Sequence, residues 1–242
     1  MSNPTRGTLY LIPSLLGDSP VENSLPSYNI EIIRSIDEYI VEDIRSARRF
    51  LIKAKIDKPI DSLTFHLCNE HSKNADINFT MQGLMNGQNA GLISEAGCPS
   101  IADPGAEIIQ FAHRNNIRVV PLVGPSSILL ALISSGLNGQ NFTFNGYLPK
   151  KEPDRIKAIR QLELLASQKN QTQIFIETPY RNDALLKDLI NTCREETLLC
   201  VASDITLATE SIKTQSIRQW KTAKQSFNDH PAVFLLGKTA GM

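Results

Sequence analysis

Short apolar runs alternate with helical stretches along almost the whole chain. The run TLYLIP (8–13) is typical of a buried strand, and LTFHL (63–67), AGLIS (90–94) and IRVVPLV (117–123) repeat the pattern. Between these runs, segments such as IRSARRFLIKAKI (44–56) and GAEIIQFAHRNN (105–116) have helical spacing of apolar residues. Strands that alternate with helices favour parallel sheets covered on both faces. The sequence therefore predicts an α/β fold.

The chain is too rich in strands for one ordinary open sheet, because about ten are expected over its 242 residues. Near Leu122, the strand-like VVPLV runs into the Pro/Gly break GPSS. We therefore predict two α/β domains, residues 1–121 and residues 122–242. In the second, strands are expected at 142–148, 172–177, 197–203 and 232–237, with helices at 153–168 and 181–194 and a less regular segment before the last strand.

Composition narrows the classes of partner and location. Hydrophobic residues make up 41% and charged residues 21%, which fits a globular protein. The formal net charge is zero, so an RNA partner would need a local basic patch. No apolar run approaches the length of a membrane span, and the N-terminal residues do not resemble a signal peptide. We expect a cytoplasmic protein that does not enter the membrane.

The four cysteines form no C-x-x-C pair, which argues against a zinc ribbon or a thioredoxin-type motif. His66, Cys68 and His71 stand close together in HLCNEH and could ligate a metal. Because no second cluster completes such a site, we expect a strand end that runs into a polar loop, and no metal.

Three loops rich in proline and glycine follow expected strands: PSLLGDSP (13–20), SEAGCPSIADPG (94–105) and GPSS (124–127). Ligands of open α/β sheets bind outside the carboxyl ends of the strands. Glycine permits close approach to the backbone, and proline stiffens a loop in advance. Taken singly, each loop could be a tight turn, but three together favour a binding site. The usual nucleotide fingerprints, G-x-x-x-x-G-K-[ST] and G-x-G-x-x-G, are absent, as is the G-x-S-x-G of hydrolases.

Seven motifs in order resemble the tetrapyrrole methylase superfamily, most closely its branch of small-subunit ribosomal RNA methyltransferases. They are GTLYLIPSLLG, VEDIR, FHLCNEH, ISEAGCPSIADPG, VVPLVGPSS, FNGYLPKK and FIETPYR, and they span Gly7 to Arg181. The resemblance implies two α/β domains with S-adenosylmethionine bound in the cleft between them, a homodimer, and methylation of a ribose 2′-oxygen in 16S rRNA. The cofactor residues it implies are Pro13, Gly17, Ser94, Glu95, Ala96, Gly97, Ser126, Ser127 and Leu148.

The candidate catalytic residues are Glu42, Asp43, Arg45, His66 and Glu177, because an acceptor hydroxyl needs help to lose its proton. Structural alternatives stay open for several of them. Asp43 could simply cap a helix that begins at Ile44, and His66 could be a core histidine. Arg48, Arg49, Lys53 and Lys55 form a solvated helix face unless Lys150, Lys151 and Arg155 lie beside them to form an RNA patch.

The sequence departs from the family pattern at several positions. Glu95 and Cys98 replace an Asp and a Thr of the cofactor loop, Cys68 and Tyr180 each replace a His, and Ser203 and Leu207 stand where the family has Arg and Lys. Two other functions therefore stay open: methylation of a small tetrapyrrole precursor, and cofactor binding without catalysis. Replacing Gly97 with a β-branched residue is expected to impair cofactor binding more than folding.

Overall fold

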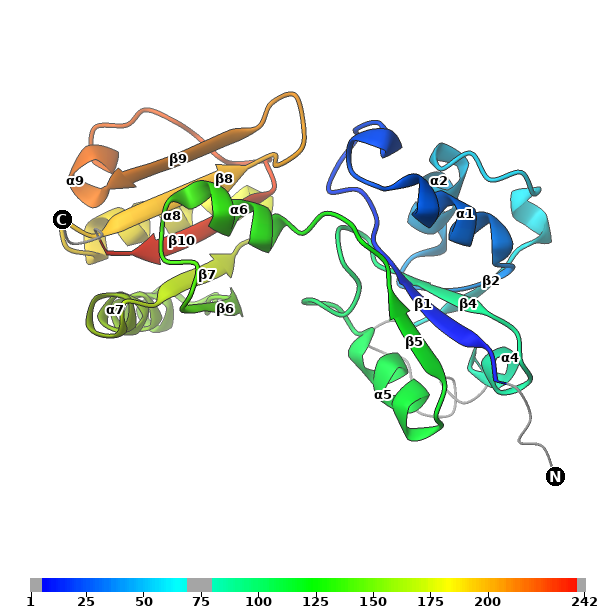
Figure 1. The fold of residues 1–242 in the computed structure, drawn as a ribbon. Helices are drawn as coiled ribbons and strands as arrows, with labels where there is room; N and C mark the ends of the chain where they lie inside the picture. The colour runs from blue at the N-terminus through cyan, green and yellow to red at the C-terminus, as the bar shows by residue number, and fades with distance from the viewer. Residues whose placement is uncertain (1–5, 69–79, 239–242) are drawn as a thin grey trace. The chain divides into compact units, whose positions relative to one another are not determined.

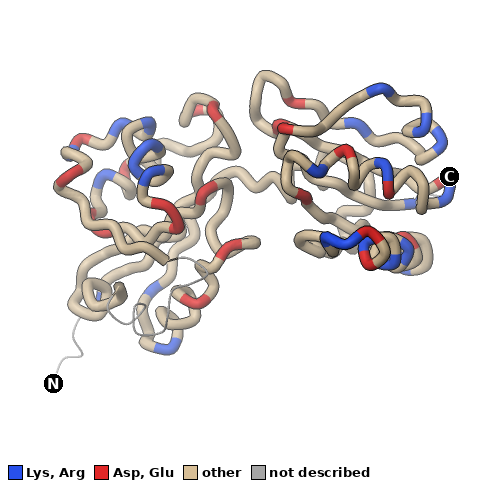
Figure 2. Tube along the Cα trace, turned by 180° about the vertical axis from the view of Figure 1, so that it is seen from behind, with Lys and Arg blue, Asp and Glu red and all other residues tan. Residues whose placement is uncertain are grey.

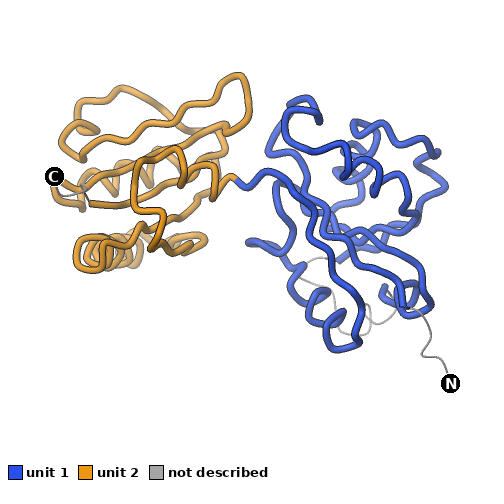
Figure 3. The backbone as a smooth tube through the Cα atoms, in the orientation of Figure 1, with its two compact units in different colours: residues 1–126 blue, residues 127–242 orange. Residues whose placement is uncertain are grey.

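The structure of the chain is a computed structural model that describes residues 6–68 and 80–238. The chain divides into two compact units, residues 1–126 and residues 127–242 (Figure 3). The division falls directly before a helix that begins at Ser127, whereas the sequence places it between residues 121 and 122. Among the described residues, each unit contains one five-stranded sheet.

The sheet of the first unit is parallel throughout and has the order β3-β2-β4-β1-β5. Its strands are β1 (Thr8–Ile12), β2 (Glu38–Val41), β3 (Thr64–Leu67), β4 (Ala90–Ile93) and β5 (Arg118–Pro121). All five therefore end at the same edge of the sheet. The sequence-based expectation of a parallel sheet is confirmed for this unit.

Helices cover both faces of the first sheet (Figure 1). On one face, α1 (Ser27–Ser35) and α2 (Ile44–Lys53) pack in a core that includes Ile33, Phe50 and Leu51. On the other face, α4 (Gln82–Met85) and α5 (Ala106–Arg114) pack in a core that includes Leu84 and Ile108. Adjacent residues of a strand enter opposite cores, as Ile93 and Leu92 do, because side chains alternate along a strand.

The sheet of the second unit has the order β6-β7-β10-β8-β9 and is mixed. Its strands are β6 (Phe142–Tyr147), β7 (Thr172–Ile176), β8 (Leu198–Ser203), β9 (Ser211–Ser216) and β10 (Ala232–Gly237). Helices α7 (Glu152–Lys169), α8 (Asn182–Thr192) and α9 (Ile217–Trp220) pack in one core with Phe175 and Phe234. Helix α6 (Ser127–Ser135) contacts β8, β9 and β10. Short 3-10 helices lie at Val21–Asn23, Ile60–Ser62 and Pro179–Arg181.

The expectation of a parallel second sheet is wrong for three of its four strand pairs. Only β6 and β7 run parallel, while β7–β10, β10–β8 and β8–β9 are antiparallel. The connection from β8 to β9 is a short turn, and parallel neighbours would need a crossover of a dozen or more residues. Strand β9 itself falls in the segment expected to be irregular. Its sequence SIKTQS has one apolar residue, which is typical of an exposed edge strand.

Within residues 6–68 and 80–238, no helix is long and apolar enough to cross a membrane.

Candidate functional site

The three loops rich in proline and glycine lie at the carboxyl edge of the first sheet and are joined to one another. The amide of Ser14, in the loop after β1, donates a hydrogen bond of 2.9 Å to the carbonyl of Gly97 in the loop after β4. The thiol of Cys98 lies 3.4 Å from the carbonyl oxygen of Pro125, in the loop after β5, and donates to it. These contacts tie the ends of three neighbouring strands into one backbone-rich surface.

Two glycines allow this close packing of loop against loop. A Cβ on Gly124 would lie 2.2 Å from Cγ of Pro13, which is too close for real atoms. Gly97 has a φ of +73°, and a Cβ there would lie 3.1 Å from Cδ2 of Leu16 and 3.3 Å from the Pro125 carbonyl oxygen. A side chain at residue 97 would therefore strain the backbone and press on the protein itself. A change at residue 97 is therefore expected to cost folding stability as well as cofactor affinity.

The second half of the loop after β4 is closed by Asp103. Its carboxylate accepts hydrogen bonds of 2.8 Å from the amides of Ser100 and Gly105. Ser100 and Ala102 adopt left-handed conformations, with φ of 68° and 63°. Conformations of this kind are costly for residues other than glycine and need surrounding contacts to hold them. The Asp103 carboxylate supplies those contacts and gives the loop a defined shape.

Two serines place hydroxyl groups inside this edge. Ser94 is buried, and its Oγ donates a hydrogen bond of 2.8 Å to the Gly97 carbonyl. Ser14 is only 4% exposed, and its Oγ has no hydrogen-bond partner among the described residues. A buried hydroxyl without a partner is unfavourable, since it has lost water and gained nothing in return. The Ser14 hydroxyl is thus a polar group at this edge whose hydrogen-bonding capacity is unused.

A shallow recess lies at the same edge, and its free volume of about 10 Å3 is about what one water molecule needs. Its lining combines apolar strand ends with polar and acidic groups: Glu42, Cys68, Leu92, Ile93, Ser94, Pro99, Asp103 and Gly105.

Glu42 directly follows β2. Among the residues that line the recess, it is the one whose pKa departs furthest from its ordinary value. Burial raises the pKa of its carboxyl group, and the negative charges of Asp103 and Glu95 raise that pKa further, to about 7. Desolvation and nearby like charges both disfavour the ionised form of a carboxyl group. Glu42 therefore exchanges its proton near neutral pH, as a general base must.

The remaining catalytic candidates of the first unit lie elsewhere. Asp43 caps α2, because its carboxylate accepts a hydrogen bond of 2.7 Å from the Ser46 amide, and that bond lowers the pKa of Asp43. Arg45 is exposed on the first turn of α2. His66 lies within β3, where its Nε2 is 3.6 Å from a carboxylate oxygen of Glu38. Asp43, Arg45 and His66 do not line the recess.

Of the candidate metal ligands His66, Cys68 and His71, the last lies outside the described residues. Asn69 and Glu70 of the same motif also lie outside them. Among residues 6–68 and 80–238, no three His, Cys, Asp or Glu side chains are grouped so that they could hold a metal ion.

Pro13, Gly17, Glu95, Ala96 and Ser126 all belong to the joined loops of the first unit. The other three candidates, Ser127, Leu148 and Glu177, belong to the second unit. Ser127 is the first residue of α6, and Leu148 directly follows β6 and is buried.

A closed turn contains Ser203 and Leu207, the positions at which the resemblance leads us to expect an Arg and a Lys. Ser203 ends β8 and is buried, and the Asp204 carboxylate that follows lies 2.7 Å from Nδ1 of His230. The same carboxylate accepts a hydrogen bond of 2.7 Å from the hydroxyl of Thr209. This chain thus has a network of uncharged and acidic groups at that position, with His230 as its basic member.

Two of the four basic residues of α2, Arg48 and Lys53, pair with carboxylates of the same unit, as does Lys55 just after the helix. Arg48 lies 2.7 Å from Asp61, Lys55 lies 3.7 Å from Glu22, and Lys53 pairs with Asp18. In the second unit, Arg155 donates from Nε to Asp188 at 2.7 Å, in a pair that is almost buried. Arg155 therefore pairs with a carboxylate of its own unit. Figure 2 shows that basic and acidic residues alternate along both units.

Comparison with known proteins identifies the family. The model of the Tetrapyrrole (Corrin/Porphyrin) Methylases matches residues 30–220, which is most of the chain. The chain belongs to the tetrapyrrole methylase family. This methylase is 32% identical over 200 residues to the "Ribosomal RNA small subunit methyltransferase I" of Synechocystis, covering 83% of this chain and 67% of that protein. The protein of the same name from Escherichia coli O157:H7 is 30% identical over 208 residues, covering 86% and 68%. The chain thus spans about two thirds of the length of these relatives.

Solved structures agree at the level of the fold. The methyltransferase CobJ superposes with a TM-score of 0.64 at 16% identity, covering 97% of this chain and 95% of that one. The uroporphyrin-III-C-methyltransferase of Thermus thermophilus gives 0.55 at 17% identity, covering 97% and 93%. The prediction of a two-domain methylase fold is confirmed, and the chain is a member of a methyltransferase family whose chemistry requires a methyl donor.

The sequence analysis overlooked Ser14 as a candidate site residue. Its one signal is its position, since it is the single polar residue in LIPSLLG, directly after a buried strand. Only the structure shows that its hydroxyl is buried without a partner.

Proposed function

We propose that this methylase transfers a methyl group from S-adenosylmethionine to a ribose 2′-oxygen of small-subunit ribosomal RNA. The names of the relatives support the acceptor. The observation that carries the proposal is the carboxyl edge of the first sheet, where the loops after β1, β4 and β5 are joined by Ser14, Gly97, Cys98 and Pro125. Ligands bind at this edge in open α/β sheets.

The donor set at this edge fits a nucleoside with an amino-acid moiety. The unpartnered hydroxyl of Ser14 would donate to the ligand or accept from it, and the backbone of Glu95 and Ala96, on the exposed part of the loop, offers amides and carbonyls. The ligand supplies a methyl group made electrophilic by its positively charged sulfur. The chain would hold that methyl group in line with the acceptor oxygen, which accounts for much of the rate enhancement in reactions between two bound partners.

Glu42 would receive the proton of the acceptor hydroxyl. A carboxyl group with a pKa of about 7 is about half ionised at neutral pH, and it is a stronger base than an ordinary glutamate. Asp103 and Glu95 contribute through their charges, because they raise the pKa of Glu42. The proposal further includes a homodimer and a cytoplasmic location, which sedimentation and cell fractionation would test.

The experiment has two stages. Calorimetry with S-adenosylmethionine and the full chain tests cofactor binding, and absence of binding at high cofactor concentration would overturn the whole proposal. Transfer of a radiolabelled methyl group into fractionated RNA and small-molecule pools then tests the acceptor. We expect label in 16S rRNA from cells that lack the corresponding methylase. Label in the small-molecule pool would reject the RNA acceptor, and binding without transfer would indicate a cofactor-binding protein that has lost catalysis.

A further inference from the structure

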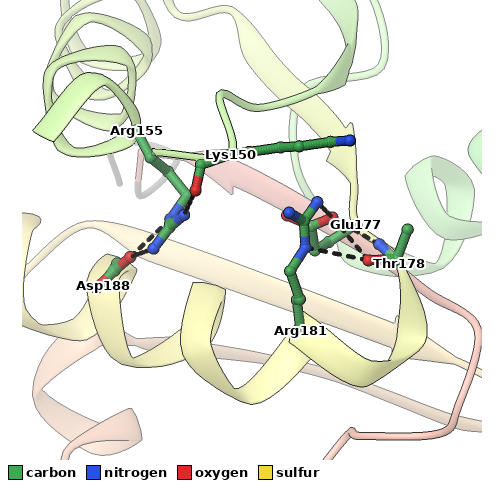
Figure 4. Close-up of polar contacts among 6 residues, drawn as sticks. All are labelled: Lys150, Arg155, Glu177, Thr178, Arg181 and Asp188. Atoms are coloured by element: carbon green, nitrogen blue, oxygen red, sulfur yellow. Dashed lines mark hydrogen bonds and ion pairs between the residues drawn. The ribbon is translucent and has the colours of Figure 1, made fainter. Parts of the chain in front are cut away.

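The second unit brings two charged and aromatic segments together at one edge of its sheet. Strands β6 and β7 run parallel, with Tyr147 opposite Ile176, so the segments that follow them leave the sheet at the same edge. One segment contains Lys150 and Lys151, and the other contains Tyr180 and Arg181. Figure 4 shows the side chain of Lys150 extending toward the Glu177–Arg181 pair.

Arg181 is held in place by its own segment. Its Nη2 pairs with the carboxylate of Glu177, whose side chain is only 1% exposed, and its Nε donates a hydrogen bond of 3.1 Å to the hydroxyl of Thr178 (Figure 4). The Thr178 amide donates to the same carboxylate at 2.7 Å. Two anchors on one planar guanidinium fix its orientation. Glu177 is thus a positioning residue for Arg181.

The guanidinium of Arg181 in turn supports an exposed aromatic ring. Its carbon lies 5.6 Å from the ring centroid of Tyr180, within the range of a cation–π contact. Tyr180 is nevertheless 68% exposed, so most of the ring surface is open to a partner. The ring thus contacts a cation on one side and is open to a partner over most of its surface.

The two lysines add available positive charge. Both are exposed, and neither is within ion-pair distance of a described carboxylate, unlike Arg155, Arg48 and Lys53. Residues 127–242 carry 14 Lys and Arg against 11 Asp and Glu, a net charge of +3, whereas residues 1–126 carry 11 against 14, a net charge of −3. The zero net charge of the whole chain conceals this division. Glu152 and Asp154 in the first turn of α7 reduce the local field but leave the lysines unpaired.

We propose that one surface of the second unit binds a single-stranded segment of the substrate RNA. This surface, which we call the Tyr180 ledge, consists of Lys150, Lys151, Tyr180 and Arg181. The proposal rests on the proposed function and specifies which surface takes the RNA. A base stacks on the open face of Tyr180, and the lysines contact neighbouring phosphates. Proteins that bind unpaired RNA combine aromatic platforms with basic side chains in this way, whereas an acidic protein segment would use the lysines and gain little from the ring.

Fluorescence anisotropy with a labelled 12-nucleotide oligouridine and the full chain tests the ledge. Tyr180→Ala should weaken binding about 5- to 140-fold, the effect of losing one stacked base, and Tyr180→Phe should retain it. The double change Lys150→Gln, Lys151→Gln should lower the slope of log affinity against log salt by about 0.7 for each phosphate that the lysines no longer neutralise. Matched controls are Tyr28→Ala, an exposed tyrosine of the first unit, and Lys169→Gln, about 27 Å along α7 from Lys151.

Two results would overturn the ledge directly: unchanged oligouridine affinity for Tyr180→Ala, or equal losses in the Tyr28 and Lys169 controls. Equal affinity for polyglutamate of the same charge, with the same dependence on Tyr180, would show that an acidic protein segment is the partner and would also overturn it. Calorimetry with S-adenosylmethionine in the same variants separates this result from the proposed function, because that function fails only if the unaltered chain binds no cofactor or methylates no RNA.

Discussion

The change Glu42→Gln tests the electrostatics of the recess most directly. The carboxyl group of Glu42 has a pKa of about 7 in the folded chain, against an ordinary value of 4.5. The folded chain therefore binds this proton more tightly than the unfolded chain does. As pH rises from about 4.5 to about 7, the free energy of unfolding should fall, because the folded state has to lose a proton that it holds well. Glutamine has no proton to lose and should not show this decline.

The size of the effect follows from the shift. A difference of about 2.5 pKa units corresponds to about 3.5 kcal/mol, at about 1.4 kcal/mol for each unit. Glu42 is only half-buried, and water screens its interactions with Asp103 and Glu95, so we reduce the expected contribution to about 1 kcal/mol. The variant should therefore gain about 1 kcal/mol of stability relative to the unaltered chain between pH 5 and pH 8.

Two measurements check this. Urea unfolding at pH 5, 6, 7 and 8 gives the difference in the free energy of unfolding, and carbon NMR of the glutamate carboxyl groups gives the pKa of Glu42 from the signal absent in the variant. Glu31→Gln, on the exposed side of α1, is the control. Parallel stability curves for Glu42→Gln and the unaltered chain, together with an NMR pKa near 4.5, would refute the reasoning. Methyl transfer, if Glu42 is the base, should rise with pH through about 7 and be largely lost in the variant.

Three further changes follow from the geometry. Gly97→Val should lower the free energy of unfolding by about 2 kcal/mol, because of its φ of +73° and the contact with Leu16, and calorimetry should show cofactor affinity falling with it. Ser14→Ala should leave thermal stability unchanged or slightly raised but weaken cofactor binding about 2- to 13-fold, the effect of one hydrogen bond of about 0.5–1.5 kcal/mol, so unchanged affinity would speak against a role for this hydroxyl. Asp188→Ala should destabilise the second unit by about 3 kcal/mol in urea unfolding because it leaves Arg155 buried and unpaired, whereas adding Arg155→Met should restore much of the loss.

Much of the fold could be predicted from the sequence because burial leaves a periodic signal. The apolar runs of β1 and β4 and the helical spacing of α2 and α5 are local patterns, and they identify the parallel sheet of the first unit. The second sheet could not be predicted in the same way. Strand direction there depends on the short turn between β8 and β9 and on β10 entering between β7 and β8. Pairing partners far apart in sequence leave no periodic trace in either segment.

The candidate site, too, could be predicted from the sequence only in part. The sequence places Glu42, Ser94, Gly97 and Asp103 after strands, and parallel strands must end at one edge, so their proximity could be expected from the sequence. His66 has an equally suggestive sequence position, but its imidazole lies near Glu38 within the sheet. A motif fixes which strand a residue belongs to, while the packing of neighbouring strands decides which way its side chain faces.

The sequence alone determined the family, the alternation of strands and helices, and the loops rich in proline and glycine, since these depend on residue type and local spacing. Tertiary structure alone decided the burial of the Ser14 hydroxyl, the raised pKa of Glu42 and the fixed guanidinium beneath the open ring of Tyr180. Desolvation and electrostatic coupling depend on which atoms surround a group, and most of those atoms come from distant parts of the chain.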